Sequence, residues 1–236
     1  MANQSAIVNG LFPVEPNFNF GLFSSSNSGK TVQAITFIKH FSLFYPHHKV
    51  SKVIVVSGMQ QPIYDKIKEA HSCIFHNSID EKLLDLIDSA YNPGEYILVF
   101  IDDLGAKLAK NDVFTKLVTV YGHHRNVCNI VTAHSIYSHS TPSWRTFIKN
   151  LHLIAIGSSA TQRQAACTLF TQIFGTGGAN KCQLCIEAAE TMQKQRYGNN
   201  YWFLYVNTSA TCDSAYRIFF DPFSSLPVIF AFSSRI

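Results

Sequence analysis

The segment FGLFSSSNSGKTVQ (residues 20–33) decides how the rest of the chain is interpreted. Its Gly29-Lys30-Thr31 ends the phosphate-binding pattern GxxxxGK(S/T), but Ser24 stands where that pattern has its first glycine. A serine can occupy ordinary turn geometry, so this is a weak departure. The alternative interpretation is a chance Ser-Gly-Lys-Thr at the start of a helix, where serine is a common cap. The other elements of the chain have to decide between the two.

The context of this loop is the one that a nucleotide site requires. Residues 18–24 predict a strand, residues 24–29 a loop, and residues 30–41 a helix in which Val32, Ile35 and Ile38 are spaced for burial. The backbone N–H groups of such a loop wrap phosphates, and the helix N-terminus adds a favourable dipole. Lys30 would reach the β- and γ-phosphates of ATP, and the Thr31 hydroxyl would ligate Mg²⁺. The residues predicted to bind the nucleotide are Ser25, Ser26, Asn27, Ser28, Gly29, Lys30 and Thr31.

The composition is that of a globular domain. Hydrophobic residues make up 47% of the 236 residues and charged residues 14%, and no apolar run reaches the ~18 residues of a membrane span. The formal net charge of +4 permits contact with nucleic acid but does not demand it, because no block of lysine and arginine is present. Six cysteines at irregular positions, without a signal peptide, favour a reduced compartment over a disulfide framework. We therefore expect an intracellular protein without a membrane partner.

Short apolar runs alternate with helical patterns along the chain. Residues 79–91 and 112–122 have apolar side chains at helical spacing, and Gly122 is the expected end of the second helix. The strand-like runs are apolar on both faces, which indicates parallel strands covered by helices on both sides. The predicted strands are residues 18–24, 53–58, 96–103, 129–135 and 151–157, followed by antiparallel edge strands at 201–207, 215–221 and 228–233. This order predicts a three-layer α/β fold with a mainly parallel central sheet, formed by one domain of residues 18–236 after an irregular segment of residues 1–17.

Two acids close the most apolar of these runs. Residues 97–101 lead directly into Asp102 and Asp103, and the carboxyl end of a buried parallel strand is where nucleotides bind in such folds. Asp102 would hold the Mg²⁺ shell, and Asp103 could orient or deprotonate the attacking water. The alternative is an ordinary strand that ends in polar loop residues. Together with the phosphate-binding loop upstream, the pair favours a site for ATP and Mg²⁺.

The order of these motifs resembles that of the poxvirus-type genome-packaging ATPases of the FtsK–HerA superfamily, which have similar enzymes in virophages and in Polinton-like and adintovirus-like elements. The resemblance covers about residues 18–160, and the terminal strands of the family also look like YWFLYVN and AYRIFF. It follows GKT (29–31), ILVFIDDLG (97–105), YGHHRNVCNIVTAHS (121–135) and PSWRTFIKNLHLIAI (142–156). The resemblance implies a RecA-like P-loop NTPase fold of the ASCE class and a ring-forming motor that packages DNA.

Three residues carry what the resemblance implies for catalysis. His134 stands where the family has a sensor glutamine, and a neutral histidine can also donate and accept, although the role would then depend on pH. His123 stands at an arginine position of the family. Arg145 falls where the family has an arginine before its next strand, so it is the predicted arginine finger that acts on the neighbouring subunit's site. Arg125 and Arg163 are its rivals for that role.

The last third of the sequence gives weaker signals. The CQLC spacing of Cys182 and Cys185 would suit zinc, but no second pair follows, and residues 180–195 also predict a helix with Leu184, Ala188 and Met192 on one face. Residues 174–181 predict a flexible loop, and contact with DNA in a pore is one interpretation of it.

The resulting hypothesis is a motor that hydrolyses ATP and moves viral double-stranded DNA into a capsid. Its expected partners are the DNA, a capsid, portal or vertex protein, and further copies of the chain in a ring, with a hexamer as the expected size. The expected location is the host nucleus or cytoplasm where virions assemble, or the virion itself. Two alternatives stay open: a related motor that moves another polymer, and a nucleotide-dependent binding module with weak hydrolysis.

Overall fold

The computed structural model describes residues 11–13, 15–137, 139–209, 212, 217–225 and 227–232. Within them the chain forms one nine-stranded sheet with the strand order β3-β2-β4-β5-β1-β6-β7-β8-β9. The six parallel strands are β1 (Asn19–Phe23), β2 (Lys49–Ser57), β3 (Cys73–His76), β4 (Glu95–Asp102), β5 (Val127–Ala133) and β6 (Leu153–Gly157). The three antiparallel strands are β7 (Phe203–Asn207), β8 (Ile218–Phe220) and β9 (Val228–Ile229).

The predicted mainly parallel sheet with C-terminal edge strands is confirmed. β3 was not predicted, because its four residues are only half-buried and carry no long apolar run. The expected edge strands at 215–221 and 228–233 extend in part beyond the described residues, which leave out 215, 216 and 233. Residues 1–10 and 14 of the expected irregular segment also lie outside the description.

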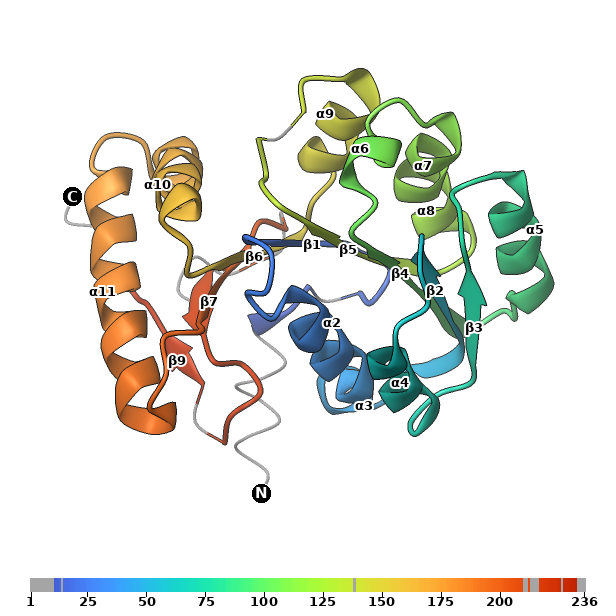
Figure 1. The fold of residues 1–236 in the computed structure, drawn as a ribbon, viewed down its shortest axis with the longest axis horizontal. Coiled ribbons are helices and arrows are strands. Elements are labelled where there is room, and N and C mark those ends of the chain that lie inside the picture. The colour runs from blue at the N-terminus through green and yellow to red at the C-terminus, as the bar shows by residue number, and fades with distance from the viewer. Residues whose placement is uncertain are drawn as a thin grey trace.

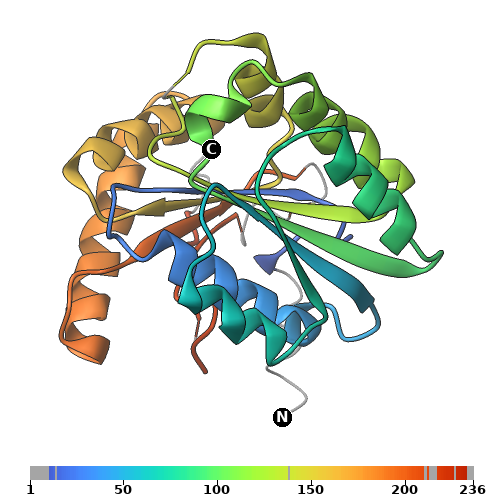
Figure 2. The same ribbon diagram turned by 45° about the vertical axis from the view of Figure 1, so that its right-hand side comes forward.

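Helices cover both faces of the sheet and give the fold its three layers (Figures 1 and 2). One face carries α2 (Lys30–Lys39), α3 (Phe41–Phe44), the 3₁₀ turn η1 (Pro62–Tyr64) and α4 (Asp65–Lys68). The other carries α5 (Glu81–Ala90), α6 (Gly105–Leu108), α7 (Asp112–Lys116), the π-helical η2 (Leu117–Tyr121), α8 (Gly122–His124) and α9 (Pro142–Lys149). Beside β6 and β7, the same face is covered by the hairpin of α10 (Ala160–Phe174) and α11 (Gly178–Tyr197). No helix in the described part of the chain is long and apolar enough to cross a membrane.

Two expectations for the helices were wrong in detail. Val32 is 52% exposed, whereas Ile35 and Ile38 are buried as expected together with Phe37. Gly122 does not end its helix, because α8 continues to His124 with Gly122 in right-handed helical geometry.

The π-helical turn η2 interrupts the pattern that the sequence predicts as one regular helix. A π turn replaces the α-helical hydrogen-bond spacing by a wider one, so its carbonyl oxygens need accommodation. Side-chain amides from the sheet fill this need: Asn19 Nδ2 donates to the Val118 oxygen at 2.9 Å, and Asn129 Nδ2 donates to the Leu117 oxygen at 3.3 Å. Both asparagines are buried, so the amides hold this irregular turn against β1 and β5.

The hairpin of α10 and α11 differs from the expectations for the last third. Leu184 is 61% exposed, and α11 turns Cys182, Cys185 and Ala189 into the core instead. No cluster of three or more metal-binding side chains occurs among the described residues, and this finding gives the zinc alternative no support. The expected loop at 174–181 is mostly helical, because α10 ends at Phe174 and α11 begins at Gly178.

Candidate functional site

The parallel strands bring the predicted residues to one edge of the sheet. β1, β4 and β5 end at Phe23, Asp102 and Ala133, and the segments that follow them meet at this carboxyl edge. There a cavity of about 480 Å³ lies over the N-terminus of α2. Its lining is Ser26, Asn27, Ser28, Gly29, Lys30, Thr31, Val32, Gln61, Asp102, Asp103 and His134. Apart from Ser25, which is not in the lining, the predicted loop residues thus share one cavity with both acids and the histidine.

The loop from Ser24 to Gly29 curls tightly before α2 begins. Two of its residues have left-handed backbone geometry, Asn27 with φ 57° and Gly29 with φ 87°. Asparagine and glycine are the residues that adopt this geometry at least cost, so the sequence suits the turn. Gly29 also directly precedes the first helical residue, Lys30. The backbone N–H groups of the first helical turn therefore open into the cavity, as an anion site requires.

The Lys30 side chain is held inside the loop. Its ammonium group donates to the carbonyl oxygens of Ser24 and Ser25, both at 2.8 Å, and only 7% of the residue is exposed. Burial lowers the pKa of Lys30 from its usual value, while the nearby carboxylates of Asp103 and Asp102 act to raise it. A phosphate group entering the cavity would offer this cation stronger, charged acceptors in place of the two carbonyls.

The Asp102 side chain links the elements that form the site. Its carboxylate is 2% exposed and accepts hydrogen bonds from three hydroxyl groups on three different elements. Thr31 on α2 donates at 3.0 Å, Tyr64 on η1 at 2.8 Å, and Thr132 on β5 at 2.5 Å. The carboxylate is thereby fixed between the helix that follows the phosphate-binding loop and the neighbouring strand.

Asp103 points from the same strand end into open solvent. Its backbone has left-handed geometry (φ 54°), and its N–H donates to Thr132 Oγ1 at 3.0 Å. Its carboxylate, 60% exposed, lies 3.2 Å from Nε2 of His134. Asp103 and His134 therefore form a pair that can hold a water molecule or exchange a proton at the mouth of the cavity.

The pair of Thr31 and Asp102 has the donors that Mg²⁺ requires. Magnesium prefers oxygen ligands and is usually held by one or two protein groups together with phosphate oxygens and water. The Thr31 hydroxyl and the Asp102 carboxylate lie within 3.2 Å of each other and both line the cavity. The residues present thus fit a magnesium ion shared with a nucleotide.

The sequence analysis missed Tyr64 and Thr132. Tyr64 is 3% exposed, and its pKa is raised, mainly by burial, so its hydroxyl stays a donor to Asp102. Thr132 is fully buried and contacts both acids, since it donates to Asp102 and accepts from the Asp103 N–H. Neither residue belongs to a recognisable sequence motif, since Tyr64 lies after strand β2 and Thr132 lies within strand β5. Only the TA of NIVTAHS, beside the predicted sensor, could have drawn attention to Thr132.

The predicted arginine finger lies apart from this cavity. Arg145 is an exposed residue of α9, does not line the cavity, and forms no ion pair with any described residue. Its two rivals are engaged within the chain: Arg125 Nε donates to Asp88 at 2.6 Å, and Arg163 pairs with Glu190. Arg145 is therefore the arginine of the three that is free to reach another copy of the chain.

Together, the sheet and the phosphate-binding loop define a RecA-like P-loop NTPase fold. Known structures resemble this chain in fold. The DNA-packaging ATPase B204 from Sulfolobus Turreted Icosahedral Virus superposes with a TM-score of 0.53 at 13% identity, over 82% of this chain and 93% of that one. The genome packaging NTPase B204 from Sulfolobus turreted icosahedral virus 2, in complex with ATP-gammaS, gives 0.51 at 14% identity over the same shares. The sequence matches no protein-family model, and the comparison with curated proteins gives no match either. At this identity the likeness establishes the fold.

Ser24, the departure from the phosphate-binding pattern, packs against a glycine of the neighbouring strand. Ser24 is fully buried, and its Oγ has no hydrogen-bond partner among the described residues. A Cβ added to Gly157 at the end of β6 would lie 2.4 Å from that Oγ and 2.7 Å from the Ser24 Cβ. The serine side chain thus occupies the space that a side chain at position 157 would need.

We predict that Gly157→Ala destabilises the protein by about 1–3 kcal/mol because of this overlap. Ser24→Gly alone should be nearly neutral, since it removes an unpaired buried hydroxyl but adds backbone freedom. In the double variant most of the cost of Gly157→Ala should disappear, because only Phe203, 3.0 Å from the new Cβ, still crowds it. Urea unfolding of the four proteins measures the coupling, and strict additivity would contradict the contact.

Tyr64→Phe should weaken the binding of Mg²⁺ at Thr31 and Asp102 without unfolding the chain. The substitution removes one of the three donors to the buried Asp102 carboxylate, which leaves that carboxylate less well held. We expect a loss of about 1–2 kcal/mol in stability and a rise of several-fold in the Mg²⁺ concentration that half-saturates this pair of ligands. Tyr45→Phe, whose hydroxyl donates to the Pro13 oxygen away from the cavity, is the matched control. Equal magnesium requirements in both variants would show that Tyr64 has no part in the site.

Proposed function

We propose that the chain is an ATPase that works as a ring-forming motor and moves viral double-stranded DNA into a capsid. The observation that carries the ATPase is the meeting of Thr31 with Asp102 beside the buried Lys30. The likeness in fold to two viral packaging ATPases supports the packaging role. The motifs within residues 18–160 resemble those of the poxvirus-type branch of the FtsK–HerA superfamily and support membership of that branch. The motor would act where virions assemble, with a capsid, portal or vertex protein as its dock.

In this mechanism the residues of the chain bind ATP, place a water and stabilise charge. Lys30 leaves the carbonyls of Ser24 and Ser25 and binds the β- and γ-phosphate oxygens. Thr31 and Asp102 would hold a Mg²⁺ ion, and such an ion would supply positive charge against the phosphates. Asp103 takes the proton of the water that attacks the γ-phosphorus, and the bond from that phosphorus to the bridging oxygen breaks, releasing ADP and phosphate. His134 lies beside Asp103 and would donate a hydrogen bond to an oxygen of the γ-phosphate, before or after the phosphate is released.

Binding of the proposed DNA partner requires only a few phosphate contacts from each subunit. A net charge of +4 is modest, but several subunits around one duplex each add a few phosphate contacts. The second candidate is a nucleotide-dependent binding module, and the contact between Asp103 and His134 favours it. If this contact persisted with ATP bound, the Asp103 carboxylate could not accept a proton from the attacking water.

Lys30→Ala should abolish ATP binding or reduce turnover at least 100-fold, because the phosphates lose their buried cation. Lys39→Ala is the matched control, since Lys39 lies on the same helix but pairs with Glu69 at the surface. Phosphate release by the parent protein should rise when duplex DNA is added. Binding of ATP without turnover, with and without DNA, would favour the binding module, and full turnover by Lys30→Ala would refute the site.

Arg145→Ala should lower turnover by about 10³-fold or more if the residue is the finger of a neighbouring subunit. Asp103→Asn should also be inactive, but for a defect in its own cavity. Mixing the two inactive proteins should restore activity, because some interfaces then combine an intact cavity with an intact Arg145. Arg125→Ala and Arg163→Ala serve as comparison variants, and mixtures that stay inactive would exclude Arg145 as a residue acting between subunits.

A further inference from the structure

One buried polar side chain next to His134 has no role in the mechanism above. Gln162 lies in the first turn of α10 and is only 2% exposed. The buried residues of this helix recur at the spacing of an apolar stripe, and they are Gln162, Ala165, Ala166, Leu169 and Phe170. Gln162 therefore occupies the first position of a stripe whose other members are all apolar.

The Gln162 amide has a hydrogen-bond partner on one side only. Its Nε2 donates to the carbonyl oxygen of His134 at 2.6 Å, whereas its Oε1 is buried and has no partner among the described residues. A buried amide oxygen without a donor costs free energy, so this side chain is a poor choice for a core position. Departures of this kind from the pattern of a core are expected at functional positions, and the contact with His134 indicates which function.

The bond from Gln162 to His134 joins segments that follow two strands which are not neighbours. His134 follows β5, Gln162 lies on the helix after β6, and β1 lies between these two strands. Ser24, the first residue after β1, donates its N–H to the carbonyl oxygen of Ala133 at 3.2 Å. The carbonyl groups of Ala133 and His134 are thus held by two different segments, the phosphate-binding loop and α10.

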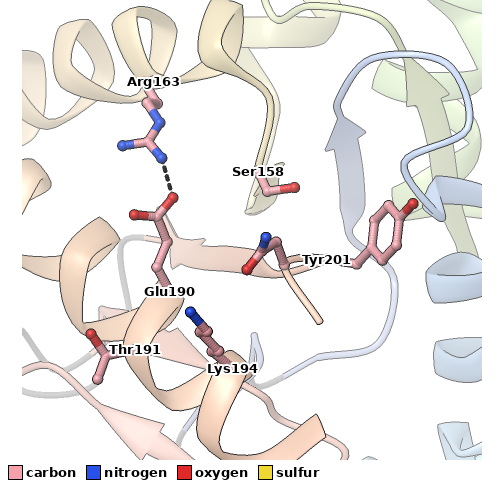
Figure 3. Close-up of a pocket in the computed structure, with 7 residues that line it drawn as sticks. Ser158, Arg163, Glu190, Thr191, Lys194 and Tyr201 are labelled. Atoms are coloured by element: carbon pink, nitrogen blue, oxygen red, sulfur yellow. Dashed lines mark hydrogen bonds and ion pairs between the residues drawn. The ribbon is translucent and has the colours of Figure 1, made fainter. Parts of the chain in front are cut away.

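The helix that carries Gln162 is packed tightly against its neighbour. Arg163, the next residue of α10, forms an ion pair with Glu190 of α11 (Figure 3). A Cβ added to Gly178 at the start of α11 would stand 2.4 Å from the carbonyl oxygen of Phe170 on α10. The two helices therefore form one packed unit, and a movement of this hairpin would reach His134 through Gln162.

The side chain of His134 extends toward the nucleotide cavity. Its Nε2 lies 3.2 Å from the Asp103 carboxylate, and both residues line the cavity. Because the backbone of His134 is anchored to α10, the orientation of its ring depends on that anchor. Resting on the proposed function, we infer that Gln162 is a positioning residue: it fixes the backbone of the proposed sensor His134 and couples the α10–α11 hairpin to the γ-phosphate.

Gln162→Met tests this role, because methionine has a similar length, suits the core and cannot donate to the His134 carbonyl. We expect the variant to lower kcat by up to about 100-fold, since a displaced sensor no longer meets the γ-phosphate, and to leave the KM for ATP nearly unchanged. Gln164→Leu is the matched control and should turn over ATP like the parent chain, since Gln164 lies on the same helix but is exposed. Gln162→Asn has an amide that is one methylene shorter, so it should behave like Gln162→Met and replaces it if that variant does not fold.

A cycle of double variants separates positioning from a purely structural contribution. In a His134→Ala background the main-chain carbonyl of residue 134 is still present, so Gln162→Met should lower the urea midpoint as much as it does in the parent chain. Its effect on kcat should disappear, because the side chain that it positions is gone. An equal fold-loss of kcat in both backgrounds would overturn the inference.

A readout without nucleotide keeps this inference separate from the proposed function. The ring signals of His134 are identified in the NMR spectrum by their loss in His134→Ala. We expect Gln162→Met to shift these signals and Gln164→Leu to leave them in place. Unmoved His134 signals in Gln162→Met would overturn the inference, whatever the ATPase activity. Shifted signals in a chain that does not hydrolyse ATP would refute the proposed function and still support Gln162 as the residue that holds His134.

Discussion

The carboxylate of Asp102 and its three hydroxyl partners are the constraint on which the site depends. A buried carboxylate without partners is costly, so its place at the end of β4 requires donors at fixed positions. Thr31, Tyr64 and Thr132 meet this requirement from α2, η1 and β5, which ties the helix after the phosphate-binding loop to the strands of the acidic side. The same Thr132 hydroxyl accepts the Asp103 N–H and helps to hold its left-handed backbone, so the second acid is turned outward by the contact that fixes the first.

The sheet order then divides the carboxyl edge into two sides. β1 lies between β5 and β6, so the loop after β1 has the acids on one side and the α10–α11 hairpin on the other. The switch from parallel to antiparallel pairing at β7 matters as well, because it makes the chain enter β7 at the carboxyl edge and brings Tyr201 to the level of the loop.

The sequence predicted those elements and residues whose pattern along the chain has a single physical cause, such as burial on both faces or phosphate binding. The long apolar runs of β2, β4 and β5 are buried on both faces, and the loop residues Lys30 and Thr31 follow from the chemistry of phosphate binding. It failed where the cause is distant. Val32 follows helical spacing but lines the open cavity, and Leu184 follows it but lies on the solvent side of α11. Tyr64 reaches Asp102 only because η1 folds back to the end of β4. The irregular turn η2 is held by asparagine amides of two strands, which no window of neighbouring residues reveals.

Ser24 shows how a departure from a motif can be read in physical terms. A glycine is needed either for left-handed backbone geometry or for space. In this loop the left-handed positions are Asn27 and Gly29, while Ser24 is not among the described residues with positive φ. The remaining requirement is space, and Gly157 provides it, since its missing side chain leaves room for the Ser24 hydroxymethyl group. The space that the pattern obtains from a glycine at position 24 is supplied here by Gly157 of the neighbouring strand. A linear motif cannot detect this, because the two residues are far apart in the sequence. The backbone N–H groups that would bind phosphate come after Ser24, so the substitution by itself gives no reason to regard the loop as inactive.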